Sequence, residues 1–189
     1  MPQEFFEEII KMPLSLGANK ANIITTDKIT FDKYFREICV SNACGMYGKC
    51  WMCPPSVGDI FELMGEVKKY DYILVYQTVG ILEDSYDFDG MMVAKRISSK
   101  LTCQVRASFK KFNMSNILVL GVGGCGICDV CSKSEDKSCR FPELAIPSLE
   151  AYGINVSLLA KAAGMKYCNG QNTVTYFGAV LFSLGGEEK

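Results

Sequence analysis

The ten cysteines of this chain are unevenly distributed, because eight of them fall into two short segments. The first segment, residues 39–53, has the spacing C-x4-C-x5-C-x2-C, and the second, residues 125–139, has the spacing C-x2-C-x2-C-x7-C. The first group consists of Cys39, Cys44, Cys50 and Cys53, and the second group consists of Cys125, Cys128, Cys131 and Cys139. Thiolates repeated at such short intervals can bind one metal centre together. We predict that all eight cysteines are metal ligands.

The spacing of the second group is typical of an iron-sulfur site. Three cysteines at two-residue intervals can wrap one face of a four-iron cluster, and a fourth from farther along the chain completes the ligand set, as in bacterial ferredoxins. An all-cysteine zinc site more often consists of two C-x2-C pairs. We therefore predict a 4Fe-4S cluster here, with structural zinc as the alternative. The first group has a less standard spacing, and the same alternatives apply: a second iron-sulfur cluster or zinc.

The second group overlaps a different motif, because Gly121, Gly123 and Gly126 spell G-x-G-x-x-G behind an apolar run. A dinucleotide fingerprint requires a helix that begins at the last glycine and an acidic residue about 20 positions later. The chain continues as CDVCSKSEDKSC, which has no helical periodicity of apolar residues. We interpret the glycines as small residues that let backbone N–H groups approach thiolate and sulfide.

Composition narrows the chemistry further. The chain has no histidine, which excludes mixed Cys/His zinc sites and every catalytic pair that uses imidazole. Its formal net charge of -1 gives no bulk attraction to nucleic acid. No apolar run approaches the roughly 18 residues of a membrane span, and residues 1–11 are too acidic for a signal peptide. We expect a cytoplasmic protein whose clustered cysteines bind metal rather than form disulfides.

Apolar periodicity predicts the elements that must position these cysteines. We expect helices over residues 4–12, 57–69, 90–113 and 155–163, strands over 71–77, 116–122 and 173–184, and a strand pair within 21–31. The strand-helix-strand order from residue 71 to residue 122 predicts parallel pairing through a right-handed crossover. The expected fold class is α/β (α+β): a single domain, residues 1–189, with a mixed sheet of about four to six strands.

The helix expected over residues 90–113 is strongly basic. It has no acidic residue and six cationic ones, Lys95, Arg96, Lys100, Arg106, Lys110 and Lys111. A solvated helix face explains such a pattern, and a docking surface for an acidic redox partner protein is the functional alternative. Cys103, on the same helix, is either a reactive exposed thiol or a small tolerated residue. We assign no role to Cys168.

Several of these segments resemble a known family. YGKCWMCPP (47–55), CGICDVC (125–131), CRFPELAIPSLEAYGINV (139–156) and the TYFGAVL ending are similar to a family of predicted metal-binding proteins catalogued as domain of unknown function 2284. The resemblance extends over roughly residues 36–182 and implies cysteine-bound metal, as iron-sulfur, in anaerobic bacteria and archaea. In the family pattern, the position of Cys50 commonly holds another residue. A first cluster with only three protein thiolates would leave one iron open to a substrate.

Three hypotheses about function follow. In the first, the protein is an electron carrier with two clusters. In the second, it is a redox enzyme in which the second group transfers electrons to a site at the first group, near Tyr47, Lys49 and Trp51. In the third, it is a zinc protein that acts through a protein partner. A chain of 189 residues is longer than two clusters alone require, which favours an additional binding site. Both redox hypotheses need a redox partner protein. None of the three involves nucleic acid or a membrane.

Overall fold

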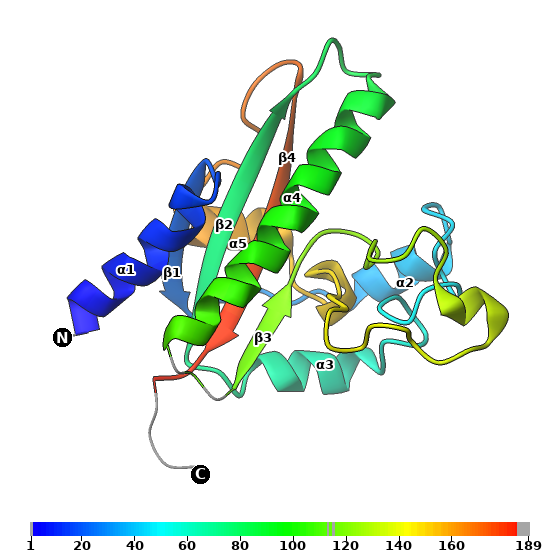
Figure 1. Ribbon diagram of the computed structural model, residues 1–189, viewed down its shortest axis with the longest axis horizontal. Helices are drawn as coiled ribbons and strands as arrows, with labels where there is room; N and C mark the ends of the chain where they lie inside the picture. Colours follow the sequence, from blue (N-terminus) through cyan, green and yellow to red (C-terminus); the bar gives the residue numbers. More distant parts are fainter. Residues whose placement is uncertain (1, 113, 115, 185–189) are drawn as a thin grey trace.

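Four β-strands form one sheet at the centre of the computed structural model, which describes residues 2–112, 114 and 116–184 (Figure 1). The strands are β1 (Lys20–Thr25), β2 (Tyr72–Ile81), β3 (Ile117–Leu120) and β4 (Thr173–Phe182). Their order across the sheet is β1-β2-β4-β3, and every neighbouring pair is antiparallel. The α/β class is therefore confirmed, and the sheet is antiparallel rather than mixed.

Helices cover both faces of this sheet. The α-helices of the described residues are α1 (Pro2–Ser15), α2 (Tyr34–Val40), α3 (Ile60–Val67), α4 (Phe88–Phe109) and α5 (Val156–Ala162). The 3-10 helices are η1 (Thr26–Lys28), η2 (Lys110–Phe112), η3 (Ser132–Glu135) and η4 (Glu150–Tyr152). In Figure 1, α1 and α4 lie on the near side of the sheet and α5 lies behind it.

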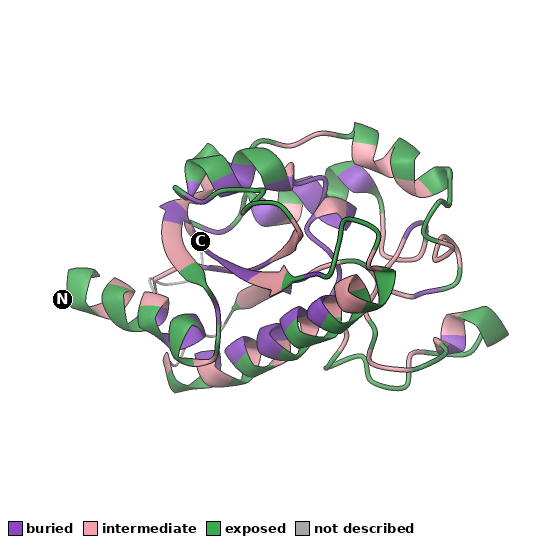
Figure 2. Ribbon diagram, turned by 90° about the horizontal axis from the view of Figure 1, so that it is seen from above, coloured by how far each residue is buried: buried purple, intermediate pink, exposed green. Residues whose placement is uncertain are grey.

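Alternate residues of β2 face two separate layers of helices, as the two-residue period of a strand requires. Leu74 and Tyr76 pack with buried side chains of α1 and α4. Ile73 and Val75 pack on the opposite face with buried side chains of α3, α5 and η4. All four strand residues are fully buried. The result is three layers, and the buried stripe of α4 faces the sheet (Figure 2).

The predicted parallel pairing of the strand-helix-strand unit is wrong. β2 and β3 are each hydrogen-bonded to β4 and not to each other. Since both are antiparallel to β4, they run in the same direction with β4 inserted between them. The C-terminal strand, which is distant in sequence, thus separates the two strands that α4 connects.

Two local predictions also need correction. In the predicted strand pair of residues 21–31, β1 is followed by η1, and Phe31 makes only an isolated bridge with Ile154. The helix expected over residues 57–69 is shorter, because Asp59 acts as its N-cap and accepts hydrogen bonds from two backbone N–H groups of the first turn.

Both cysteine-rich segments lie beyond β3 at the same end of the molecule (Figure 1). The first segment connects α2 to α3, and the second follows β3. Gly121 and Ser148 form a parallel bridge, which closes the second segment into a loop. In the described residues, no helix combines the length and the apolar character that a membrane crossing requires.

Candidate metal centre

The first cysteine segment folds back on itself between α2 and α3. Cys39 lies in the last turn of α2, and the backbone N–H of Gly48 donates to the carbonyl of Pro54 at 2.9 Å. The N–H of Cys53 donates to the carbonyl of Cys50 at 3.1 Å, so these two cysteines share one tight turn. Gly48 has a φ of 71°, a left-handed conformation that favours glycine where the segment reverses.

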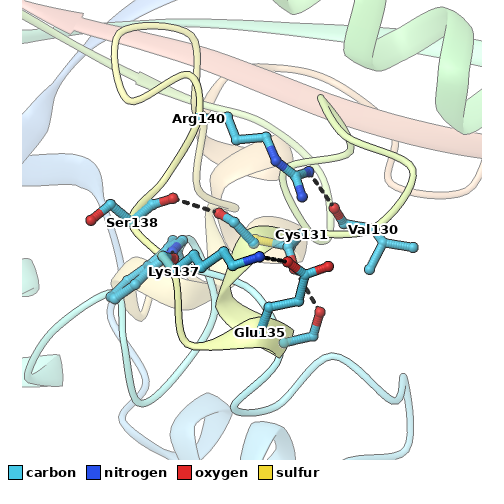
Figure 3. A network of polar contacts seen from close by, with 9 residues as sticks. Val130, Cys131, Glu135, Lys137, Ser138 and Arg140 are labelled. Carbon is cyan, nitrogen blue, oxygen red and sulfur yellow. Dashed lines mark hydrogen bonds and ion pairs between the residues drawn. The ribbon is translucent and has the colours of Figure 1, made fainter.

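The second cysteine segment is anchored at both ends. The N–H of Gly121 donates to the carbonyl of Pro147 at 2.9 Å, and the carbonyl of Gly121 accepts from the N–H of Leu149 at 3.1 Å. Within the loop, the guanidinium of Arg140 donates to the carbonyl of Val130 at 2.9 Å (Figure 3). This hydrogen bond holds the backbone beside Cys139 close to the backbone beside Cys131.

A network of polar contacts stabilises the loop between the third and fourth cysteines (Figure 3). The Ser132 hydroxyl donates to the carbonyl of Ser138 at 2.8 Å, and the Ser134 hydroxyl donates to the carbonyl of Cys131 at 2.7 Å. Trp51, from the first segment, donates through Nε1 to the carbonyl of Lys137 at 3.0 Å. Trp51 therefore links the two cysteine segments.

Five of the eight cysteines line one cavity between the two segments, which we name the cysteine cavity. They are Cys50, Cys125, Cys128, Cys131 and Cys139. All four cysteines of the second group face this space and are joined by Cys50 of the first group. The rest of the lining is mostly apolar and includes Trp51 and Phe141.

The donors of the cysteine cavity suit a metal that prefers sulfur, because every ionisable side chain in the lining is a thiol. The cavity has a volume of about 30 Å³, so the thiols would have to move apart around a four-iron cluster. In the described part of the chain, no three Cys, Asp or Glu side chains are grouped closely enough to hold a single metal ion. Zinc needs its sulfurs about 2.3 Å from one point, whereas the thiolates of a cluster bind different irons. Either kind of centre would therefore require the thiols to move from the positions that they hold in this structure.

The thiols of Cys50 and Cys53 lie close enough to change each other's pKa in opposite directions. The hydrogen bond from the Cys53 thiol lowers the pKa of Cys50 to about 5, against the effect of burial, and the backbone N–H groups of Cys125 and Met52 act in the same direction as the hydrogen bond. The pKa of Cys53 is raised, first because its thiol donates that hydrogen bond and then because it is buried. The lowered pKa of Cys50 favours its thiolate, the form that binds metal.

The remaining cysteines of the first group lie near Cys53 and form a second set. Cys44 and Cys39 are close enough to raise the pKa of Cys53 by repulsion between thiolates. Burial raises the pKa of Cys39, and the positive charge of Arg36 opposes that rise. We therefore describe the eight cysteines as a set of three, Cys39, Cys44 and Cys53, and a set of five that line the cysteine cavity; Cys50 is counted with the five and lies at the boundary, beside Cys53.

The two sets are neighbours. A Cβ atom added at Gly124 would lie 3.5 Å from Cε of Met46 and 3.7 Å from Sγ of Cys53. Gly124 precedes Cys125 directly, so the backbone of the second segment packs against a thiol of the first. These are ordinary van der Waals distances, so Gly124 lies beside the Cys53 thiol and the path between the two sets is short.

The two isolated cysteines lie outside both sets. Cys168 is exposed, whereas Cys103 is half-buried and lines a larger cavity between α4 and the second segment. Lys49, expected near the site at the first group, is exposed. The sequence did not identify the larger cavity, which also includes Lys95 and Arg96. The signal that could have found it is the basic stripe of α4 combined with the glycine-rich loop after β3.

Comparison with known proteins places these residues in a family. The family model DUF2284, described as predicted metal-binding protein, matches residues 22–182. No curated protein and no solved structure matches the chain. The matched range includes all eight cysteines of the two sets, so the candidate metal centre lies within the part of the chain that the family shares.

Proposed function

The chain belongs to the DUF2284 family of predicted metal-binding proteins, and we propose that its metal is iron, held as iron-sulfur clusters in a cytoplasmic redox protein. The proposal includes two 4Fe-4S clusters, one at each set of cysteines. All ten cysteines are free thiols, which is the state that a reducing cytosol maintains and that cluster assembly requires.

The observation that carries this proposal is the common cavity of the second group. Cys125, Cys128, Cys131 and Cys139 line it together, and no carboxylate or amine joins them in the lining. A site with thiols alone, on a chain without histidine, selects thiophilic metals. The C-x2-C-x2-C run supplies the ferredoxin-like spacing, whereas an all-cysteine zinc site more often consists of two C-x2-C pairs.

The place of Cys50 supports an enzyme rather than a simple carrier. Because Cys50 faces the cysteine cavity, the first site is left with Cys39, Cys44 and Cys53. In our proposal these three thiolates hold a cluster with one iron open to substrate, and the second cluster supplies its electrons. An open iron can bind a substrate oxygen or sulfur as a Lewis acid, which a cluster held by four cysteines does less readily.

A redox partner protein completes the proposal, because a two-cluster enzyme needs a donor or an acceptor of electrons. Val130 and Phe141 are exposed on the second segment, close in sequence to Cys131 and Cys139. Exposed apolar side chains beside a redox centre are suited to a transient protein contact. The basic residues of α4 would favour an acidic partner.

Metal analysis of protein purified without oxygen tests this proposal. Iron, zinc and acid-labile sulfide are measured per chain, and EPR spectra are recorded after reduction. We expect about eight irons with matching sulfide and two interacting spin signals. About two zinc ions without sulfide would refute the redox function and support the alternative, a structural or regulatory zinc protein that acts through a partner.

A further inference from the structure

A cavity of about 760 Å³ lies between α4 and the loop that follows β3, and we name it the α4 cavity. One wall is the polar face of α4, with Ser99 and Cys103, and the other wall is formed by the loop from Gly121 to Asp129. Three residues, Cys125, Gly126 and Ile127, line both the α4 cavity and the cysteine cavity. Its volume is within the range of small-molecule sites, so a ligand here would lie directly beside the proposed cluster.

The α4 cavity carries an excess of positive charge. Lys95, Arg96 and Lys100 line it, and Asp129 is the only acidic residue of the lining. In the described residues, none of these three cations forms an ion pair. Lys95 is half-buried, whereas Arg96 and Lys100 are exposed. The like charges of the three cations repel one another, and a bound anion would offset that repulsion.

Lys95 is held against the glycine-rich loop. A Cβ atom added at Gly123 would lie 2.9 Å from Nζ of Lys95, so the missing side chain makes room for the ammonium group. Gly123 has a φ of 62°, and a left-handed residue among others turns successive N–H groups toward one side of the backbone. The N–H groups of Val122, Gly123 and Gly124 donate to no backbone carbonyl of the described residues. They are available, with the cations, to an oxyanion.

From these contacts we infer that the α4 cavity binds a small organic molecule through a phosphate group. Three cations and free backbone N–H groups match the charge and the several acceptor oxygens of phosphate. In the described residues no α-helix begins at Gly126, and the next α-helix is α5, so this is not the dinucleotide fold that G-x-G-x-x-G usually marks. Phosphate binding in the α4 cavity does not depend on the proposed function. The idea that this binding places a substrate beside Cys125 does rest on the proposed function.

Calorimetric titration tests the inference on the full, metal-loaded chain purified without oxygen, in a chloride buffer. Inorganic phosphate and pyrophosphate are the probes, and citrate is the carboxylate comparison. Lys95→Met and Arg96→Met each remove one cation of the cavity. Arg106→Met removes one cation from the same helix outside the cavity and serves as the matched control. Ser99→Tyr keeps all the cations but fills the space, and thermal unfolding verifies that each variant is folded.

We expect pyrophosphate to bind the wild type and to bind Lys95→Met and Arg96→Met at least tenfold more weakly, which corresponds to about 1.4 kcal/mol. Arg106→Met should stay within about twofold of the wild type, since a bound oxyanion would not contact it, and Ser99→Tyr should lose binding. The inference would be overturned if neither phosphate probe bound the wild type, or if citrate bound more tightly than pyrophosphate. It would also be overturned if Arg106→Met weakened pyrophosphate binding as much as the cavity variants do, or if Ser99→Tyr left that binding unchanged.

Metal analysis of the same samples separates this inference from the proposed function. Zinc-loaded protein that binds pyrophosphate with the expected pattern would refute the iron-sulfur proposal and leave the anion site intact. Iron-sulfur protein that binds neither phosphate probe would refute the anion site and leave the iron-sulfur proposal intact. If both hold, pyrophosphate should shift the EPR signal of the reduced protein, because Cys125 and Gly126 line both cavities.

Discussion

Cys50 is the only buried cysteine of the eight, and its sulfur lies between the two sets. It interacts with the thiols of Cys53 and Cys131 and with the backbone N–H of Cys125. A thiolate in this position changes the charge and the hydrogen bonding near any metal bound on either side. The role of Cys50, as ligand or as neighbour of a ligand, therefore decides whether the first cluster has an open iron.

The variants Cys50→Ser and Cys53→Ser separate these two roles. In our proposal Cys53 binds the first cluster and Cys50 does not, so Cys53→Ser should lower the iron content from about eight to about four per chain. Cys50→Ser should keep the iron content and shift the EPR signal. Cys168→Ser, which removes an exposed thiol outside both sets, is the control and should match the wild type. Loss of about four irons from Cys50→Ser would show a first cluster with four thiolates and no open iron.

At the scale of elements, local signals in the sequence predicted most helices and strands. The apolar stripe that the sequence predicts for this helix consists of Ala94, Ile97, Leu101, Val105, Phe109 and Phe112. Four of these residues are buried in α4, whereas Ile97 is exposed and Phe112 lies in η2. Asn155 caps α5 as expected, and its side chain accepts from the backbone N–H of Leu158. These features depend on side chains a few residues apart, which is why a sequence pattern can indicate them.

The ends of helices and strands, and the short connections between them, were predicted less well from the sequence. The second strand expected within residues 21–31 is absent, because the chain after β1 turns through η1 and then pairs at Phe31 with Ile154. η4, which lies close to α2 and α3, was not predicted. Arg36 of α2 donates to the carbonyl of Ala151 in η4 at 3.4 Å, so η4 helps to position the helix that carries Cys39.

Gly153, which ends η4, tests the importance of this junction. It has a φ of 72°, and an added Cβ would lie 2.3 Å from Cε of Met64 and 3.1 Å from Cδ1 of Ile60 in α3. Gly153→Ala should therefore destabilise the protein by about 2–4 kcal/mol, from the left-handed backbone together with overpacking. Gly164→Ala is the matched control, because Gly164 has a φ of 71° and nothing within 4 Å of an added Cβ.

Urea unfolding of the two variants measures this difference. Gly164→Ala should cost about 1–2 kcal/mol, the backbone contribution alone. Gly153→Ala should also lower the metal content, since a shift of η4 away from α3 would disturb the contact of Ala151 with Arg36 of α2. Equal destabilisation by both substitutions would mean that Met64 moves aside at no cost and that η4 does not hold α2 in place.

At the scale of the whole molecule, the order of the strands could not be predicted from the sequence. The insertion of β4 between β2 and β3 depends on contacts between residues about 60 to 110 positions apart. The same limit applies to the candidate metal centre. The spacing of the second group indicated its cysteines correctly as neighbours on one cavity, whereas the contact of Cys50 with Cys125 and Cys131 is made between the two segments and leaves no periodic signal.

The two hydrophobic cores are separate from the candidate metal centre, and this has a consequence for folding. None of the eight cysteines belongs to either core, and both cores are built from the strands and the helices that cover them. Metal binding should therefore stabilise a chain that already folds, in contrast to a zinc finger, which is unfolded without metal. Metal-free protein and the Cys125→Ala variant should both keep a cooperative urea transition and the far-ultraviolet circular dichroism of the wild type.

Paired unfolding and metal measurements check this expectation. Cys125→Ala should lose the second cluster, about four irons per chain, while its urea midpoint falls only by the stabilisation that the lost metal contributed. Cys103→Ala, a cysteine substitution outside both sets, should keep the full metal content. A metal-free wild type without a cooperative transition would show that the cysteine segments belong to the folding unit. A folded wild type beside an insoluble Cys125→Ala variant would instead assign Cys125 a packing role that its half-buried position does not suggest.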